Sequence, residues 1–150
     1  MTVQLLPPFE IQIKNTTADI RDALSSLRNA LEPLGLPAEE HGTVEMVVAE
    51  VLNNIVEHAY ARTQSGEEKI DIHCAHKSDG LHLTITDQGQ QLPNGALPAG
   101  EQAEVDVELE DLPEGGFGWF LIKTLVKSLH YQRLDGANQL DICLAVGVVQ

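Results

Sequence analysis

Three polar side chains recur at every fourth position inside one apolar stretch of the sequence. Glu50, Asn54 and His58 lie in EVLNNIVEHAY, among valine, leucine and isoleucine residues. On an α-helix this spacing places them within an arc of about 80°, at the border of the apolar stripe. Polar groups held there, half in water and oriented by the core, could form a functional site. The pattern also fits a surface helix whose polar flank is only solvated.

A second polar cluster, Asp87-Gln88-Gly89, follows an alternating, strand-like stretch. An aspartate with a glycine two positions later is often a plain turn. In a binding site, the same pair could accept a hydrogen bond from an amino group, while the glycine lets a flat ring approach the backbone. Adenine carries one such amine, so the cluster is a candidate for binding a nucleotide base.

A third cluster places Gly115, Gly116 and Gly118 at the start of an apolar, helix-like stretch. Glycines lose much conformational entropy on folding, so a group of them indicates a tight turn or a close approach. The N–H groups at the start of a helix suit phosphate oxygens. No Gly-Lys-Ser/Thr follows and no strand directly precedes, which excludes a Walker loop and a dinucleotide fingerprint. A packing turn and an anion site both remain open.

Length and charge restrict the class of protein. The chain has 150 residues, which fits one domain over residues 1–150. Its net charge of −14 argues against nucleic acid as a partner, because phosphate backbones are held by clusters of Lys and Arg. The negative charge does not exclude a nucleotide, and it suits a basic protein partner.

The apolar runs are too short for a membrane span, and the N-terminus does not resemble a signal peptide. We therefore expect a cytoplasmic protein without membrane contact.

The two cysteines, Cys74 and Cys143, each lie in an alternating run. In a reducing cytoplasm, two buried thiols are expected rather than a disulfide. Cys74 stands in His-Cys-Ala-His, and these are metal-binding residue types. On a strand, however, Cys74 faces the opposite side from His73, so these two side chains cannot converge on one ion.

The hydrophobic periodicity predicts a mixture of helices and strands along the chain. A strand at 9–14 precedes two helices, the first ended by Gly35 and the second running from Pro37 to about Ala61. An aperiodic segment at 88–114 has the length of a lid. It separates a predicted hairpin from an apolar helix and two final strands, with strands expected at residues 69–75, 81–86, 130–134 and 139–146. This order implies an α/β (α+β) two-layer sandwich, with a mixed, mostly antiparallel sheet and helices on one face.

Taken together and in this order, the three clusters resemble the GHKL (histidine-kinase-like) ATPase/kinase superfamily. The best match is its branch of small anti-sigma-factor serine/threonine kinases. That branch has a helix with E-x-x-x-N-x-x-x-H-A/G-Y, a strand ending in D-x-G, and then E-G-G-x-G-x-x-L/F-I. Residues 50–60, 87–89 and 114–122 match these motifs, and the resemblance continues along the tail to Asn138. It implies a Bergerat-type ATP-binding fold with a lid at about residues 90–114.

The resemblance also implies a role for each matching residue. Asn54 would bind the Mg²⁺ of Mg-ATP, and Glu50, one turn earlier, would accept the proton of the attacking hydroxyl. Asp87 would accept a hydrogen bond from the adenine amine, with Gly89 leaving room for the base. His58 would either orient Asn54 or pack behind it. The phosphates would be held by the N–H groups of the glycine cluster, which comprises Gly115, Gly116 and Gly118.

The sequence departs from the family pattern in two places. Gln91 stands where many relatives have a second glycine, at a point where the anti-sigma branch varies. No Lys or Arg occurs between Asp87 and Ile122, so the lid has no cation for the terminal phosphate. Charge compensation would then fall to Mg²⁺, the helix N-terminus and Lys123 or Arg62. Slow phosphate transfer is compatible with this composition, and so is ATP binding without transfer.

The resemblance implies a Mg-ATP-dependent protein serine/threonine kinase that phosphorylates a small anti-anti-sigma (STAS-like) partner. By the logic of the family it would also bind a sigma factor or another output, and relatives often form homodimers. A competing hypothesis is that the protein is an ATP-gated binding module, which sequesters a regulatory partner without phosphate transfer. The catalytic domain of a two-component histidine kinase is disfavoured, because the sequence contains no dimerisation helices or phospho-accepting His segment.

Overall fold

A single antiparallel sheet with helices on one face makes up the residues that the computed structural model describes, 4–61, 66–92 and 116–149. The strands are β1 (Phe9–Lys14), β2 (Lys69–Lys77), β3 (Gly80–Asp87), β4 (Ser128–Leu134) and β5 (Ala137–Leu144). They lie in the order β1-β2-β3-β5-β4, and every neighbouring pair is antiparallel. The α-helices are α1 (Thr17–Leu31), α2 (Ala38–Asn54) and α4 (Gly116–Leu125).

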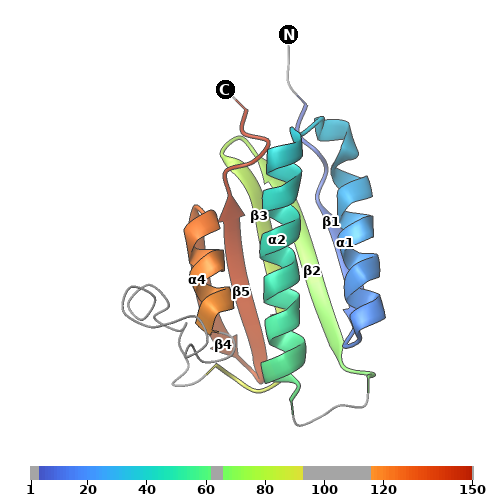
Figure 1. Ribbon diagram of the computed structural model, residues 1–150, viewed down its shortest axis with the longest axis vertical. Helices are drawn as coiled ribbons and strands as arrows, with labels where there is room; N and C mark the ends of the chain where they lie inside the picture. The colour runs from blue at the N-terminus through green and yellow to red at the C-terminus, as the bar shows by residue number, and fades with distance from the viewer. Residues whose placement is uncertain (1–3, 62–65, 93–115, 150) are drawn as a thin grey trace.

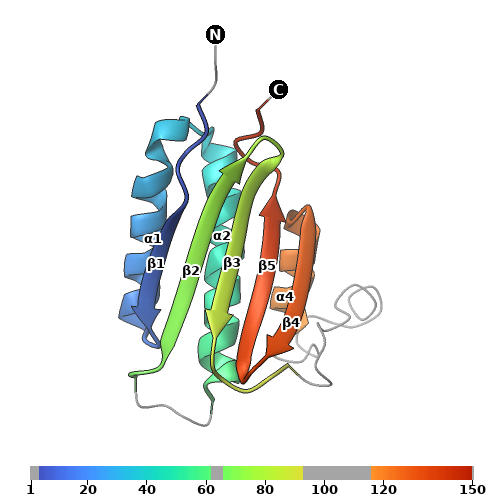
Figure 2. The same cartoon turned by 180° about the vertical axis from the view of Figure 1, so that it is seen from behind.

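The helices α1, α2 and α4 lie on the same face of the sheet (Figure 1), and the other face is uncovered (Figure 2). This confirms the predicted two-layer α+β sandwich with helices on one face. The described strands are antiparallel throughout rather than mixed. Among the described helices, none is both long enough and apolar enough to cross a membrane.

The period-two pattern of the strands separates an apolar face from a polar one. On β2 and β3, the side chains of Ile70, Ile72, Leu83 and Ile85 are at most 1% exposed and pack in the core beneath the helices. The matching stripe on α2 consists of Val44, Val47, Val48, Val51 and Leu52. The core therefore lies between the sheet and the helices, and it anchors α2 firmly against β2 and β3.

The ends of α1 follow from short-range chemistry. The hydroxyl of Thr16 accepts a hydrogen bond from the N–H of Asp19 at 3.0 Å, which makes Thr16 the N-cap. After Leu31 the chain tightens into a 3-10 turn, η1 (Glu32–Leu34), and then reaches Gly35 with φ of 57°. That left-handed conformation favours glycine, so the predicted helix end is confirmed.

The second helix differs from its prediction beyond Asn54. The periodicity predicts one continuous α-helix, but residues Ile55–Ala59 form a π-helical segment, η2. The N–H of Tyr60 donates to the carbonyl of Ile55 at 2.9 Å, five residues back. This wider turn changes the direction of the side chains that follow. Asn54 is buried while His58 is exposed, so the prediction of three side chains in one row is wrong for its last member.

Both cysteines are free and buried, as predicted. Cys74 faces the helices, and burial raises the pKa of its thiol to about 12. Cys143 lies on the uncovered face of β5, where burial, followed by the charge of Asp79, also raises the pKa of its thiol. Both side chains are therefore neutral thiols at physiological pH.

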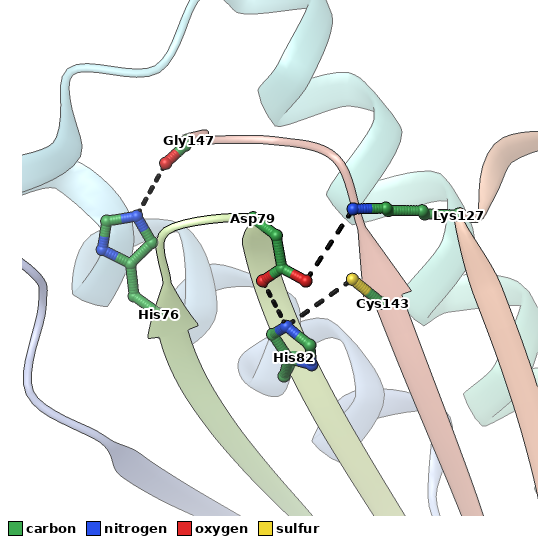
Figure 3. Close-up of polar contacts among 6 residues, drawn as sticks. All are labelled: His76, Asp79, His82, Lys127, Cys143 and Gly147. Carbon is green, nitrogen blue, oxygen red and sulfur yellow. Dashed lines mark hydrogen bonds and ion pairs between the residues drawn. The ribbon is translucent and has the colours of Figure 1, made fainter. Parts of the chain in front are cut away.

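A buried histidine on β2 joins the first and last described segments of the chain. The Nδ1 atom of His76 accepts a hydrogen bond from the N–H of Leu6 at 3.1 Å. Its Nε2 atom lies 2.7 Å from the carbonyl oxygen of Gly147 and donates to it (Figure 3). These two bonds require the neutral imidazole with its proton on Nε2. His76 is thus a structural residue rather than a metal ligand.

We expect His76→Ala to lower the free energy of unfolding by about 2 kcal/mol or more, because it leaves an N–H and a carbonyl without their partner and opens a cavity. The matched control is His73→Ala on the same strand, where the side chain is exposed and a change within about 0.5 kcal/mol is expected. Urea denaturation measures both. Equal midpoints for the two variants would contradict a structural role for His76.

Candidate functional site

The C-terminal part of α2 and the first turn of α4 meet at the end of the sheet where β3 terminates (Figure 1). A Cβ atom added at Gly118 would lie 2.8 Å from Oε2 of Glu50 and 3.6 Å from Nδ2 of Asn54. A side chain at position 118 would therefore displace the carboxylate of Glu50, while Asn54 lies at ordinary contact distance. Glu50, Asn54 and Gly118, predicted from separate motifs, are brought together.

The amide of Asn54 has no hydrogen-bond partner for its buried Nδ2 atom among the described residues. The residue is 8% exposed. A buried amide without a partner costs roughly 1–3 kcal/mol, so such a group indicates a position that a ligand satisfies. Because the two ends of an amide have the same shape, a half-turn places the carbonyl oxygen there instead. The site then offers a hard oxygen donor beside the carboxylate of Glu50.

Asp87 ends β3 and is 4% exposed. Its Oδ1 atom accepts hydrogen bonds from the N–H of Gly89 at 2.9 Å and from Nδ2 of Asn138 at 2.8 Å. Burial raises the pKa of the carboxyl group, while these two bonds and the charge of Arg133 act in the opposite direction. Both of these bonds end on Oδ1, so Oδ2 is the atom that can accept from a ligand.

Asn138 on β5 holds the segment that follows Asp87. It is 6% exposed, and its Nδ2 atom also donates to the carbonyl of Gln90 at 3.0 Å. Its Oδ1 atom accepts from the hydroxyl of Tyr131 at 2.6 Å and from Nη1 of Arg133 at 3.0 Å. The amide of Asn138 is therefore fixed in one orientation, with its N–H groups directed at Asp87 and Gln90.

The segment that follows Asp87 is attached to β4 by two further hydrogen bonds and packs against η2. Nη1 of Arg133 donates to the carbonyl of Gly89 at 2.6 Å, and the N–H of Leu92 donates to the hydroxyl of Tyr131 at 3.1 Å. A Cβ atom at Gly89 would lie 2.6 Å from the carbonyl carbon of Ala59. The glycine thus permits close packing against η2, which is a different reason from the predicted space for a base.

Tyr60 completes the connection between η2 and the sheet. Its buried hydroxyl donates to the carbonyl of Lys69 at 2.7 Å and accepts from the N–H of Gln88 at 2.8 Å. Burial raises the pKa of this hydroxyl, so it stays protonated and can make both bonds. The Tyr of the motif is therefore a positioning residue for the chain around Asp87.

The remaining predicted site residues lie on α4, on η2 or outside the described residues. Gly116 opens α4, and Lys123 lies half-buried on the same helix. His58 is exposed on η2, and its supporting role stays a prediction. The predicted lid beyond Leu92, with Gly115 and Arg62, lies outside the described residues.

No role at the site was predicted from the sequence for Tyr131, Arg133 or Asn138, although the resemblance extends along this tail. Asn138 carries a signal in retrospect, because it falls on the apolar face of an alternating strand, where a polar residue needs a partner. Arg133 and Tyr131 lie on the same face of β4, across from β5. Their function depends on strand register, which the sequence alone does not specify.

The residues present fit Mg²⁺ and ATP. Within the described part of the chain, the buried Nδ2 atom of Asn54 has no partner, and it lies near the carboxylate of Glu50 at the first turn of α4, where helix N–H groups suit phosphate oxygens. The carboxylate of Asp87 lies at the end of the same sheet, with Oδ1 occupied by two donors. Together these groups could accept a hydrogen bond from an amine, bind a cation and donate hydrogen bonds to an anion.

Comparisons with known proteins identify the family of the chain. The family model for the histidine kinase-like ATPase domain matches residues 13–144 of the chain. The serine-protein kinase RsbW of Halalkalibacterium halodurans is 29% identical over 118 residues, 78% of this chain and 68% of that protein. The serine/threonine-protein kinase BtrW of Bordetella bronchiseptica is 30% identical over 135 residues, 89% of each.

A solved structure also shares the fold. The crystal structure of the RsbU and RsbW domains of Rv1364c from Mycobacterium tuberculosis superposes on 93% of this chain with a TM-score of 0.63. The identity is 19%, and the match covers 32% of that chain. The chain belongs to the histidine kinase-like ATPase domain family, and its similarity to relatives named as serine/threonine-protein kinases confirms the branch that the motifs predict.

Proposed function

We propose that this protein is a serine/threonine kinase that uses Mg-ATP to phosphorylate a small anti-anti-sigma (STAS-like) partner. The observation that carries the proposal is the convergence of Glu50 and the partnerless amide of Asn54 on Gly118 of α4. Family membership supports ATP as the nucleotide. The relatives named as protein kinases support a serine or threonine hydroxyl as the acceptor.

Asp87 binds the adenine in this proposal. Its Oδ2 atom accepts from the exocyclic amine, while Oδ1 is held by Gly89 and Asn138. Asn54 supplies its amide oxygen to Mg²⁺, which when bound offsets the charge of the phosphates. The N–H groups at the start of α4, including those of Gly116 and Gly118, donate to phosphate oxygens.

Glu50 acts as the general base. It lies one helical turn before Asn54, and its carboxylate borders Gly118, next to the proposed phosphate position. A half-buried carboxylate there can accept the proton of a serine hydroxyl as that hydroxyl attacks. The residues at about 90–114 act as the lid of one domain that spans residues 1–150, and they exclude water from the reaction.

The proposed partners follow from the family. The protein would work in the cytoplasm, bind a sigma factor or another output, and release it when the STAS-like partner takes its place. Homodimer formation belongs to the same proposal. Neither nucleic acid nor a membrane is expected to take part, given a net charge of −14.

Asn54→Ala tests the metal-binding role. We expect the affinity for ATP in the presence of Mg²⁺ to fall at least about tenfold, with little change in the presence of EDTA. The free energy of unfolding should change little, because the buried Nδ2 atom of Asn54 bonds to none of the described residues. The control is the neighbouring, exposed Asn53→Ala, and calorimetric titration measures both. Unchanged Mg-dependent affinity in Asn54→Ala would remove this residue from the site.

Gly118→Ala tests whether the carboxylate of Glu50 must lie beside the first turn of α4. The added methyl group would meet Oε2 of Glu50 and displace it, so we expect the rate of phosphate transfer to fall about tenfold or more. Stability should be kept, since alanine is favoured over glycine within a helix. Gly42→Ala on α2 is the matched control, because a Cβ atom there meets nothing within 4 Å. Equal transfer rates for the two variants would contradict the proposed position of Glu50.

The second candidate function is an ATP-gated binding module without phosphate transfer. The observation that favours it is the absence of Lys and Arg between Asp87 and Ile122, where a cation for the terminal phosphate would be expected. Such a module would bind Mg-ATP and a partner and leave the partner unmodified.

A further inference from the structure

Three side chains of different metal-binding types meet on the uncovered face of the sheet. His82 on β3 and Cys143 on β5 are paired across the two strands, and Asp79 lies in the turn between β2 and β3. Nε2 of His82 lies 2.7 Å from Oδ1 of Asp79 and 3.7 Å from Sγ of Cys143. The three donor atoms all lie within 4.8 Å of one another, and Figure 3 shows the carboxylate and the sulfur both in contact with the ring nitrogen of His82.

This cluster is separate from the proposed nucleotide site. His82 and Asp87 are five residues apart on β3, or roughly 17 Å along a strand, and they face opposite sides of the sheet. The proposed kinase mechanism uses none of the three residues. A function for the cluster therefore goes beyond the proposed function.

The geometry argues against a Cys–His–Asp catalytic relay. Such a relay needs the carboxylate on one ring nitrogen and the nucleophile on the other. Here the carboxylate and the thiol both approach Nε2 of His82. A plain ion pair between Asp79 and His82 explains the shorter contact, and the pairing of His82 with Cys143 across β3 and β5 places a buried sulfur beside the same nitrogen.

We propose that Asp79, His82 and Cys143 form a binding site for Zn²⁺. In tetrahedral zinc sites the bonds to O, N and S are about 2.0–2.3 Å, which places neighbouring donors roughly 3.5 Å apart. The distance from Sγ to Nε2 is already close to this value at 3.7 Å. The carboxylate must move away from Nε2 by less than about 1 Å, which the half-exposed side chain of Asp79 permits. Binding of the ion would release the thiol proton of Cys143 to solvent, and the resulting thiolate and the carboxylate of Asp79 would balance the charge of the ion. The fourth position would face solvent.

A neighbouring lysine tunes this site. Nζ of Lys127 lies 3.8 Å from Oδ2 of Asp79, so it contacts the carboxylate oxygen that does not approach His82. Its positive charge opposes a second cation nearby. Lys127→Gln should therefore raise the affinity for Zn²⁺ by about two- to fivefold, whereas an ion pair alone would give the variant no such effect.

The test uses Co²⁺ as a spectroscopic probe and then Zn²⁺ as competitor, with full-length protein free of any polyhistidine tag. The wild type should show the near-ultraviolet charge-transfer band of a cobalt–thiolate bond with one ion per chain. Zn²⁺ should remove that band. Cys143→Ser should abolish it, and His82→Gln should weaken binding at least about tenfold.

Cys74→Ser is the matched control, because Cys74 is the other free cysteine and faces the opposite side of the sheet. It should keep the band. His82→Gln changes a partly exposed residue, so it keeps the test valid if Cys143→Ser folds poorly. Absence of the band in wild type, or a band and affinity that both variants at the cluster leave unchanged, would overturn the proposal.

Discussion

Glu50→Gln is expected to reduce phosphate transfer to the partner by at least about a hundredfold, while ATP affinity stays within a few-fold of wild type. Glutamine has the same shape and can fill the same space beside Gly118, but its amide does not accept a proton. The loss should therefore lie in the chemical step and not in binding. Single-turnover transfer of the γ-phosphate, together with a separate ATP titration, distinguishes the two.

The control is Glu39→Gln in the first turn of α2, at the opposite end of the helix. It removes the same charge without touching the site and should leave the transfer rate unchanged. Retention of more than about a tenth of the wild-type rate in Glu50→Gln would exclude this carboxylate as the base.

Asp87→Asn is expected to lower the affinity for ATP about a hundredfold and to shift base preference towards ITP. The N–H of Gly89 and the Nδ2 atom of Asn138 both donate to one side-chain oxygen, and neither can reverse its role. A new asparagine must therefore direct its oxygen at these donors and its NH₂ group at the base. That group repels the adenine amine but can donate to the carbonyl oxygen of hypoxanthine.

The measurement is a pair of titrations, with ATP and with ITP, for wild type and Asp87→Asn. The ratio of ITP affinity to ATP affinity should rise at least about tenfold in the variant. Equal losses for both nucleotides would point to general damage, and an unchanged ATP affinity would show that Asp87 does not contact the base.

Asp87→Asn should also change how the free energy of unfolding depends on pH. Burial raises the pKa of Asp87 above its value in the unfolded chain, so its folded state binds protons more tightly. The stability that this proton contributes is fully present below the unfolded pKa and is lost as pH rises through the folded pKa. Asp87→Asn lacks this loss, so its free energy of unfolding relative to wild type should increase as pH rises from acidic towards neutral. Urea denaturation across that range checks the sign.

The secondary structure was largely predictable because most elements follow short-range rules. The period-two pattern placed β1 at its observed bounds, and Gly35 marked the end of the first helical unit. The π-helical segment η2 was not predictable from apolar periodicity. Its position is associated with long-range contacts, since the hydroxyl of Tyr60 bridges Lys69 and Gln88.

The candidate site was predictable where each residue belongs to a local motif. Glu50 and Asn54 share one helix, and the approach of Gly118 to both agrees with the combined reading of the motifs. The bonds among Asp87, Asn138 and Arg133 depend on the pairing of β3 with β5 and of β5 with β4, and the long aperiodic segment separates β3 from both of these strands in sequence. Strand register of this kind is decided by tertiary packing, so these positioning residues emerged only with the structure.

The most direct measurement of the central claim is the mass of a candidate STAS-like partner after incubation with wild-type protein and Mg-ATP. The site described by Glu50, Asn54 and Gly118 predicts one added phosphoryl group on a serine or threonine, dependent on Mg²⁺ and absent with Glu50→Gln. A partner that forms a complex with the ATP-bound protein yet gains no phosphoryl group would contradict the kinase and leave a nucleotide-gated binding module.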